Sequence, residues 1–294
     1  MKTELSILVP CYNCRCVALV KALAMQCENI EGLRYEIIVA DDGSTDTHAC
    51  LTNKEMLELA NVIYLQRREN VGRARIRNVL ARRATSAWLL FVDSDMTVCR
   101  DDFVLRYAEL DDAYEVACGG YLLGHARGNN LRFLYEKQAA DSNTLARRNL
   151  HPYHNLHTAN LLMRRETAFA HPFDERFRRY GYEDVLLGKQ LMLSDTRIIH
   201  IDNPLLFADF ESNTHFMQKT EEALQTLHTF REELRGFSRL LNVADKIRRL
   251  HLQPLVDFYW KRRKKSWRAC LCGNQPKLKC YKYYRLGYFL SLFS

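Results

Sequence analysis

Four short, almost continuous apolar segments in the first hundred residues constrain the fold more than any other feature of the sequence. Strands covered on both faces have this pattern, whereas half-exposed strands alternate apolar and polar residues. The stretches between them have the apolar spacing of helices. Strands that alternate with helices predict βαβ units and a mostly parallel, doubly wound α/β sheet. The predicted strands are 5–10, 35–42, 62–66 and 88–95, and the predicted helices are 16–29, 46–60 and 72–84.

The rest of the chain is less regular. With 294 residues, 47% of them hydrophobic, the chain has enough apolar side chains for a large core. We expect an α/β domain over residues 1–215 and a helical, basic extension over 216–294. The further elements predicted are strands at 115–123, 157–163 and 196–201, helices at 102–112 and 183–193, and a charged helical region from 217 to 250.

Charge is distributed unevenly along the chain. Residues 246–294 hold 13 Lys or Arg and one acid, so their net charge is +12. Because the whole chain carries +8, residues 1–245 sum to −4. Basic and aromatic residues interleave in 258–268, which favours an anionic membrane surface as the partner. Nucleic acid is not expected, since RNA-reading motifs are absent; a solvated tail or a subunit contact is the alternative.

No stretch reaches the roughly 18 apolar residues of a membrane span, and the N-terminus leads directly into a strand pattern. We therefore expect a cytoplasmic protein that lies at the inner face of the membrane. The ten cysteines are expected to be free thiols, because a chain of this length needs no disulfides to form a core. A zinc site is not expected, because the cysteine spacings at 11–16 and 270–280 do not form paired knuckles.

Polar residues follow three of the four predicted strands. Because the carboxyl ends of parallel strands share one edge of a sheet, these residues predict a pocket there. Asp41 and Asp42, followed by Gly-Ser, would by themselves indicate a turn. Asp93 and Asp95 alternate along an extended segment, so their carboxylates should converge and repel unless a cation lies nearby. Oxygen ligands with open positions suit Mg²⁺ or Mn²⁺ together with substrate phosphates.

Two further segments begin helices with charged residues. Arg73, Arg75 and Arg77 lie at the start of one predicted helix, where anions bind. Alternate positions do not share a helical face, so at most one or two of these arginines reach a phosphate. Glu183 and Asp184 begin another helix, where they are either capping residues or a catalytic base.

In this order, the segments VPCYN, VADDGSTD, ENVGRARIRN, VDSD and GYED resemble glycosyltransferase family 2, the inverting transferases with the GT-A fold. The resemblance covers roughly residues 4–210. It implies transfer of a sugar from a nucleotide-sugar donor to a hydroxyl group of a glycan or lipid-linked acceptor, in cell-surface polysaccharide synthesis. A catalytically inactive nucleotide-sugar-binding module is the alternative. A nicotinamide dehydrogenase is excluded, because no G-x-G-x-x-G follows the first strand.

The resemblance also implies a nucleotide pocket. Pro10, Tyr12 and Asn13 would line it. Asp42, helped by Asp41, would hydrogen-bond the base, and a carboxylate there would accept from the ring N–H of uracil or thymine.

The same resemblance implies roles in the chemistry. Arg77 would lie near the nucleotide, Asp93 near the ribose or the metal, and Asp95 would be the direct ligand of Mn²⁺ or Mg²⁺. Asp184 would be the general base, with Glu183 beside it. A metal and a cation would stabilise the leaving diphosphate, while a carboxylate on the opposite side would take the acceptor proton.

His157 and Asn160 would line the donor-sugar or acceptor side of the pocket. The chain also departs from the family pattern. Arg73 and Arg75 stand where relatives often have small residues. Leucines follow Asn203-Pro204 where many relatives carry a histidine. His200 and His215 are the nearest candidates for a later metal ligand, although a lone histidine is more often structural.

Overall fold

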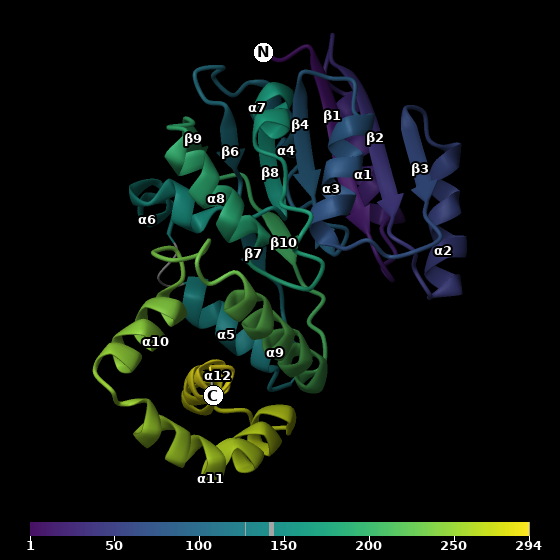
Figure 1. Cartoon of the computed structure of the whole chain (residues 1–294). Helices are drawn as coiled ribbons and strands as arrows, with labels where there is room; N and C mark the ends of the chain where they lie inside the picture. The colour runs from purple at the N-terminus through teal and green to yellow at the C-terminus, as the bar shows by residue number, and fades with distance from the viewer. Residues whose placement is uncertain (127, 141–143, 294) are drawn as a thin grey trace.

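The computed structural model describes residues 1–126, 128–140 and 144–293. Its centre is a seven-stranded sheet in the order β3-β2-β1-β4-β8-β6-β9 (Figure 1). The first four strands along the chain are parallel; β8 is antiparallel to β4 and β6, and β9 is parallel to β6. The predicted mostly parallel α/β sheet is confirmed. Its strands are β1 (Glu4–Cys11), β2 (Arg34–Asp41), β3 (Val62–Gln66), β4 (Trp88–Val92), β6 (Val116–Cys118), β8 (Asn160–Arg164) and β9 (Ile198–His200).

Helices cover both faces of this sheet, which explains the continuous apolar strands. Neighbouring residues of one strand point to opposite faces, so Ile37 and Ile38 of β2 belong to two different buried clusters. The Ile37 cluster is closed by α1 (Val17–Glu28) and α4 (Phe103–Ala108). The Ile38 cluster includes residues of α3 (Arg73–Arg83), α7 (Arg165–Ala170) and α8 (Glu183–Leu193) on the other face, and it continues into the C-terminal helices α9 (Asn213–Thr229), α10 (Arg239–Arg249) and α12 (Leu278–Ser291).

The register of the parallel strands brings their carboxyl ends to one level. Cys11 of β1 pairs with Asp41 of β2, and Asp41 pairs with Gln66 of β3. The loops after these strands therefore meet at one edge of the sheet. The loop after β2 leads into α2 (Thr47–Asn53) and the 3₁₀ helix η1 (Lys54–Glu58), and the loop after β3 leads into α3.

Two strand predictions were wrong in detail. The predicted strand 115–123 splits at Gly119-Gly120 into β6 and β7 (Tyr121–Leu123). β7 pairs instead with β10 (Leu205–Phe207), which also pairs with β5 (Met96–Thr97), and these three form a second, smaller sheet. The predicted strand 88–95 ends at Val92, because Asp93–Asp95 form a turn in which Met96 N donates to the Asp93 carbonyl.

The C-terminal part is helical, as predicted. Helix α5 packs with α9 and α12, and α11 packs along α12 (Figure 1). Aromatic residues from these helices, among them Phe216, Trp260 and Tyr281, form a third buried cluster. The boundary between residues 215 and 216 stays a prediction. The helices are α5 (Leu131–Ala140), α9 (Asn213–Thr229), α10 (Arg239–Arg249), α11 (Gln253–Cys272) and α12 (Leu278–Ser291); α6 (Leu145–Leu150) and the 3₁₀ helix η2 (Pro152–Asn155) lie beside the sheet.

Across the described residues, none of the helices combines the length and the apolarity that crossing a bilayer requires. The ten cysteines are free thiols in the structure.

Candidate active site

Asn13 joins the loops that follow β1 and β2. Its side-chain oxygen accepts hydrogen bonds from the backbone N–H groups of Thr45 (2.8 Å) and Asp46 (2.9 Å), and its own backbone N–H donates to Ser44 Oγ (2.7 Å). Its φ of +50° is in the left-handed region that asparagine tolerates. Beside it Tyr12 is exposed, and Pro10 is half-buried in β1. Tyr12 therefore offers an accessible aromatic ring at this edge of the sheet.

Asp41 and Asp42 are buried, and their carboxylates bind protein groups. Asp41 accepts from the backbone N–H of Ser44 (2.7 Å) and from the Tyr64 hydroxyl (3.1 Å). Asp42 accepts from the backbone N–H groups of Val71 and Gly72, one on each carboxylate oxygen, both at 3.0 Å. These bonds hold the loop that leads into α3. The predicted contact of Asp42 with the base stays a prediction.

Gly72 is required at the start of α3. Its φ is +89°, and a Cβ added there would lie 2.9 Å from the carbonyl oxygen of Arg178. Any side chain would therefore push apart the start of α3 and the loop before α8. This close approach brings the arginines of α3 next to the acidic start of α8.

Arg77 is the electrostatic centre of the site. Its side chain is buried and forms ion pairs with Asp93 (2.7 Å) and Glu183 (3.2 Å). Burial alone would raise the pKa of Asp93, but the positive charges of Arg77 and Arg73 more than offset this and lower it. Arg77 thus joins the carboxyl end of β4 to the start of α8. Its guanidinium is bound to two carboxylates, and its predicted place near the nucleotide stays a prediction.

Asp95 lies two residues beyond this ion pair and is exposed. The protein around it raises its pKa by desolvation, and the negative charge of Asp93 raises the pKa further. Such a carboxylate, open to solvent yet repelled by its neighbour, gains from a bound cation. In the part of the chain that the structure describes, no group of three or more His, Cys, Asp or Glu side chains is arranged to hold a metal ion. The residues fit a hard divalent cation that takes one or two carboxylates here and its other oxygens from a diphosphate.

The chain turns sharply before α8. Gly181 (φ +95°) and Tyr182 (φ +70°) are both left-handed, and a Cβ on Gly181 would lie 3.0 Å from the Cβ of Ala223 in α9. The turn places Glu183 and Asp184 in the first helical turn, where negative charge is favoured.

Asp184 is the group of this site most suited to proton transfer. Desolvation, and then the charge of Glu183, raise its pKa to about 7. One carboxylate oxygen accepts the backbone N–H of Val185 (2.8 Å), and the other lies 3.9 Å from Nδ1 of His157. Burial lowers the pKa of His157, so this imidazole is neutral at pH 7. A partly ionised carboxylate at neutral pH is well matched to general-base catalysis.

His157 and Asn160 differ in their surroundings. His157 is partly exposed and packs edge-on against Tyr121, with ring centroids 5.8 Å apart. Asn160 is buried, and its amide group bonds the Tyr107 hydroxyl (2.6 Å) and the carbonyl oxygens of Gly120 and Asn203. Asn160 therefore joins three segments beneath the site. The predicted sugar contacts of both residues stay predictions.

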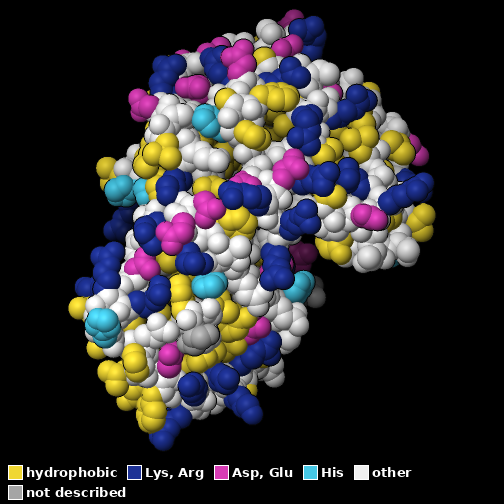
Figure 2. Space-filling model, viewed as in Figure 1, with side chains coloured by type: hydrophobic (Ala, Val, Ile, Leu, Met, Phe, Trp, Pro, Cys, Tyr) yellow, Lys and Arg dark blue, Asp and Glu magenta, His cyan; other side chains and the backbone are white. Residues whose placement is uncertain are grey.

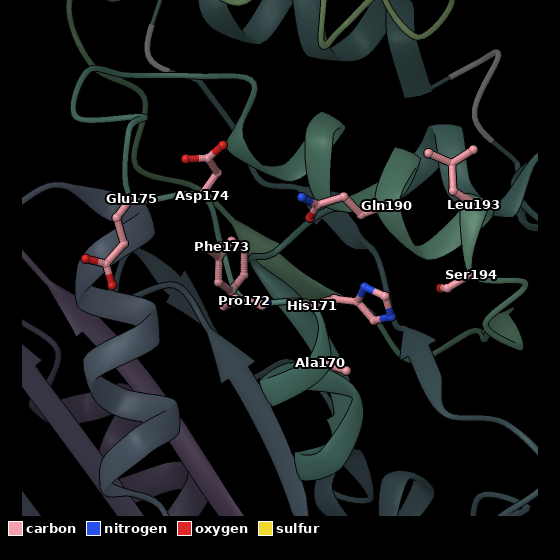
Figure 3. Close-up of a pocket in the computed structure, with 9 residues that line it drawn as sticks. All are labelled: Ala170, His171, Pro172, Phe173, Asp174, Glu175, Gln190, Leu193 and Ser194. Atoms are coloured by element: carbon pink, nitrogen blue, oxygen red, sulfur yellow. The ribbon is translucent and has the colours of Figure 1, made fainter.

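A cavity of about 580 Å³ lies away from this site (Figure 3). Its lining includes His171, Phe173, Gln190 and Ser194, and it contains none of the predicted site residues. It adjoins the carboxyl end of α8, whereas Asp184 is at the amino end of this 11-residue helix. At 1.5 Å per residue the two ends are about 15 Å apart. The site around Asp95 and Asp184 is the better candidate for an active site, because the pKa values of both carboxyl groups are raised by desolvation and by a neighbouring carboxylate.

Sequence reasoning missed Tyr180, Arg132 and Lys219, which lie next to the site. Tyr180 precedes the turn before α8, Arg132 is on α5, and Lys219 is on α9. No motif marks them. Arg132 and Lys219 belong to helices whose position relative to the sheet is set by packing, and Tyr180 lies in the loop before α8.

The parallel sheet, the acidic turn after β4 and the acidic start of α8 together define a GT-A-type glycosyltransferase fold. A family model described as glycosyl transferase family 2 matches residues 6–169. The chain belongs to this family. The match ends before Glu183 and Asp184, so the roles expected of these two residues stay predictions.

Three proteins show the range of similarity. A Haemophilus influenzae protein described as an uncharacterized glycosyltransferase is 26% identical over 146 residues, which cover 49% of this chain and 58% of that protein. The chain thus spans little more than half the length of this relative. S. aureus TarS 1–349 matches with a TM-score of 0.55 and 19% identity, over 98% of this chain and 89% of the other. The mannosyltransferase PcManGT from Pyrobaculum calidifontis matches with a TM-score of 0.54 and 13% identity, over 98% and 84%. These two structures share the fold.

Proposed function

We propose that this chain transfers a sugar, with inversion, from a nucleotide-sugar donor to a hydroxyl group of a glycan or lipid-linked acceptor, in cell-surface polysaccharide synthesis. The observation that carries the proposal is a pair of carboxyl groups next to the two carboxylates that Arg77 binds: Asp184 follows Glu183, and Asp95 lies two residues after Asp93. Asp184 has a pKa of about 7 and suits a general base. Desolvation and the charge of Asp93 raise the pKa of Asp95, which is exposed and, among the described residues, forms no ion pair within 4.0 Å.

In this mechanism Asp184 accepts the proton of the acceptor hydroxyl. The hydroxyl oxygen forms a bond to the anomeric carbon as the bond from that carbon to the diphosphate breaks. The nucleoside diphosphate leaves from the opposite face, so the configuration inverts and no covalent enzyme intermediate is needed. The neutral imidazole of His157 lies 3.9 Å from Asp184 and carries no positive charge that would lower the pKa of this carboxyl group. The carboxylate of Asp184 therefore remains basic enough to accept the proton.

Asp95, with Asp93 behind it, would hold Mn²⁺ or Mg²⁺. The metal supplies positive charge for the diphosphate oxygens of the leaving group. Arg77 holds Asp93 and Glu183 in place, and its charge helps to keep the pKa of Asp93 low. Without Arg77, the carboxylates on each side of the donor would repel each other and move apart.

The donor is a sugar linked to a nucleoside diphosphate. Among the proteins with a similar fold, TarS has been solved with UDP and with UDP-GlcNAc, and PcManGT with GDP-Man and Mn²⁺. The exposed ring of Tyr12 offers a surface on which a base can stack, at the carboxyl end of β1.

We further propose that α11 lies on the anionic surface of the membrane, at its inner face. Leu255, Phe258 and Tyr259 of α11 are at least half exposed, and Arg262 lies 4.3 Å over the Phe258 ring. The basic residues 261–265 that follow are all exposed. Hydrophobic and basic side chains lie together at the lower end of the molecule in Figure 2, where Figure 1 places α11. An apolar and basic helix face of this kind is typical of interfacial helices.

Nucleotide binding tests the donor site. Thermal shift of the protein with UDP, GDP, dTDP and CMP, each with and without Mn²⁺, should give a metal-dependent rise in Tm with one diphosphate. Asp95→Ala should abolish the metal dependence of that rise. If no nucleotide shifts the Tm under any condition, the proposed donor site is wrong.

Co-sedimentation with vesicles tests the membrane surface. Truncating the tail is unsuitable, because Trp260 and Tyr281 belong to a buried cluster with α9. The double variant Leu255→Ser, Tyr259→Ser should bind phosphatidylglycerol vesicles at least tenfold more weakly than the wild type. The control Leu51→Ser, Leu57→Ser removes two equally exposed leucines from α2 and η1 and should bind normally. Equal binding by all three proteins, or none by the wild type, would contradict the proposal.

A further inference from the structure

Arg73 lies on the same side of α3 as Arg77. Residues four apart share one helical face, and Arg77 reaches Asp93 and Glu183 from that face. Arg73 is therefore one turn nearer the helix start, above the buried ion pairs and on the solvent side. Arg75 points elsewhere and pairs with Glu175 at 3.5 Å. Of the two arginines of α3 that depart from the family pattern, Arg73 and Arg75, only Arg73 faces the candidate active site.

The position of Arg73 is not explained by folding. A cation in the first turn of a helix is opposed by the helix dipole. Arg73 is exposed and, within the residues that the structure describes, forms no ion pair shorter than 4.0 Å. Its guanidinium carbon lies instead 4.6 Å from the centroid of the Tyr180 ring. Burial would lower the pKa of Arg73, but Tyr180 and the carboxylates of Asp93, Glu183 and Asp95 more than offset this and raise it.

Tyr180 is surrounded by two more cations from the helical part of the chain. Lys219 Nζ lies 5.6 Å from the centroid of its ring, and Arg132 Nη1 donates to its hydroxyl at 3.4 Å. Lys219 is fixed by Glu211 at 3.1 Å, and Arg132 is fixed by Glu136 at 2.8 Å. Positive groups from α3, α5 and α9 therefore meet at one tyrosine beside the acidic site, and Arg73 is the one without a carboxylate partner.

We propose that Arg73, stacked on Tyr180 and flanked by Lys219, forms an anion subsite that binds a phosphoryl group next to Asp95. A planar guanidinium binds two phosphate oxygens at once, and stacking on an aromatic ring fixes its plane. The subsite rests on the proposed transfer function, since the phosphoryl group belongs either to the donor diphosphate or to a phosphate of the acceptor. It gives the helical region a direct part in substrate binding.

Calorimetric binding to the wild type, Arg73→Gln and Arg75→Gln tests the subsite. The ligands are UDP, GDP, dTDP and the matching nucleosides, with Mn²⁺ present, and inorganic phosphate. If the donor diphosphate occupies the subsite, Arg73→Gln should raise the Kd of the bound diphosphate roughly 10- to 100-fold, as expected for lost charged hydrogen bonds. The Kd of the nucleoside should not change. Arg75→Gln should behave as the wild type in every titration.

If the subsite binds an acceptor phosphate instead, the diphosphate Kd should be unchanged, while inorganic phosphate binds the wild type and Arg75→Gln but not Arg73→Gln. If the wild type binds phosphate but no nucleotide, the proposed donor function is contradicted. Phosphate binding by the wild type, Arg73→Gln and Arg75→Gln then still tests the subsite. The subsite is wrong if Arg73→Gln and Arg75→Gln bind both the diphosphate and phosphate equally, or if the wild type binds neither. Since Arg73 is exposed and unpaired, Arg73→Gln should keep the wild-type Tm, which separates lost binding from misfolding.

Discussion

The polar side chains on the two sides of the candidate active site differ in how many hydrogen bonds they form with the protein and in how exposed they are. On the side of β1 and β2, the side chains of Asn13, Asp41 and Asp42 bind neighbouring loops through short hydrogen bonds. On the side of β4 and α8, desolvation and the charge of Asp93 raise the pKa of the exposed Asp95, and Asp184 has a pKa of about 7. The first set of side chains holds the loops together through hydrogen bonds. The second set consists of carboxyl groups that a substrate or metal ion can reach and bind.

This difference separates residues that define a shape from residues that do chemistry. Satisfied buried polar groups rigidify a loop and stabilise the fold. A raised pKa is not by itself the difference, because desolvation also raises the pKa of Asp42, whose carboxylate two backbone N–H groups bind. The carboxyl groups of Asp95 and Asp184 are instead at least partly exposed, and accessible carboxyl groups with a perturbed pKa occur preferentially at functional sites. Substitutions on the two sides should therefore have opposite profiles, with stability lost on one side and activity lost on the other.

The largest expected effect is that of Asp184→Asn. Removing a general base should lower kcat by a factor of roughly 10²–10⁴. The Tm at pH 8 should be unchanged or higher, because the variant removes a buried charge that desolvation disfavours. Steady-state kinetics and a thermal melt of the same sample measure both quantities.

The control for this variant lies at the other end of the same helix. Asp195→Asn changes an exposed residue with φ +54°, a conformation that asparagine also tolerates, so its kcat should equal that of the wild type. A variant Asp184→Asn that retains full kcat would show that another group accepts the proton.

Arg77→Met should have the largest effect on stability. It leaves the buried carboxylate of Glu183 and the partly buried carboxylate of Asp93 without their cation, which typically costs about 3–5 kcal/mol. The matched variant Arg75→Met removes an exposed ion pair with Glu175 and should cost at most about 1 kcal/mol. Urea denaturation of both variants measures the two values, and equal values would mean that the buried ion pairs do not hold the site together.

The parallel half of the fold could be predicted because its signals are local. The predicted strand 62–66 agrees with β3, and the predicted helix 183–193 agrees with α8. Short continuous apolar runs such as ILV in β1, which turn residues follow, favour strands covered on both faces, and parallel neighbours require a crossover connection such as a helix. The family motifs coincide with the loops at the strand ends, so the sequence also indicated where the site lies.

The remainder depends on contacts between distant segments. Arg77 and Glu183 are 106 residues apart, and nothing local to either one predicts their ion pair. The small sheet joins residues near 97, 122 and 206, each too short a segment to have a periodic pattern. The orientation of Arg73 toward Tyr180, and of Arg75 away from the site, follows from how α3 is rotated against the sheet. Helical spacing predicted that at most one or two of Arg73, Arg75 and Arg77 reach the site, but it did not predict which of them do.

Asp42→Asn tests the side of the site that builds the loops. Asp42 binds one backbone N–H with each oxygen, so an amide NH₂ would face an N–H donor at one of them. The expected loss is about 1–3 kcal/mol. In Asp46, a single oxygen accepts both backbone N–H groups at the start of α2, so Asp46→Asn keeps both bonds and should be nearly neutral. Thermal or urea unfolding gives the comparison, and an equal loss in both variants would contradict it.

A pH-dependent gap in Tm between the wild type and Asp184→Asn is expected to correspond to no larger a change in stability than that of Asp42→Asn. The folded pKa of Asp184, about 7, is above the ordinary value of 3.8, so folding favours the protonated form. The stability contribution of Asp184 is thus fully present below about pH 4, falls as pH rises towards 7, and is constant above 7. Relative to the variant, the wild type should lose at most about 1.4 kcal/mol per pH unit, or roughly 2–4 °C in Tm. Melts of both proteins at pH 5, 6, 7 and 8 should show the gap shift between pH 5 and 7 and level off by pH 8. A constant gap would mean that Asp184 is ionised throughout this range, and the base on this side of the site would then resemble the satisfied carboxylates on the other.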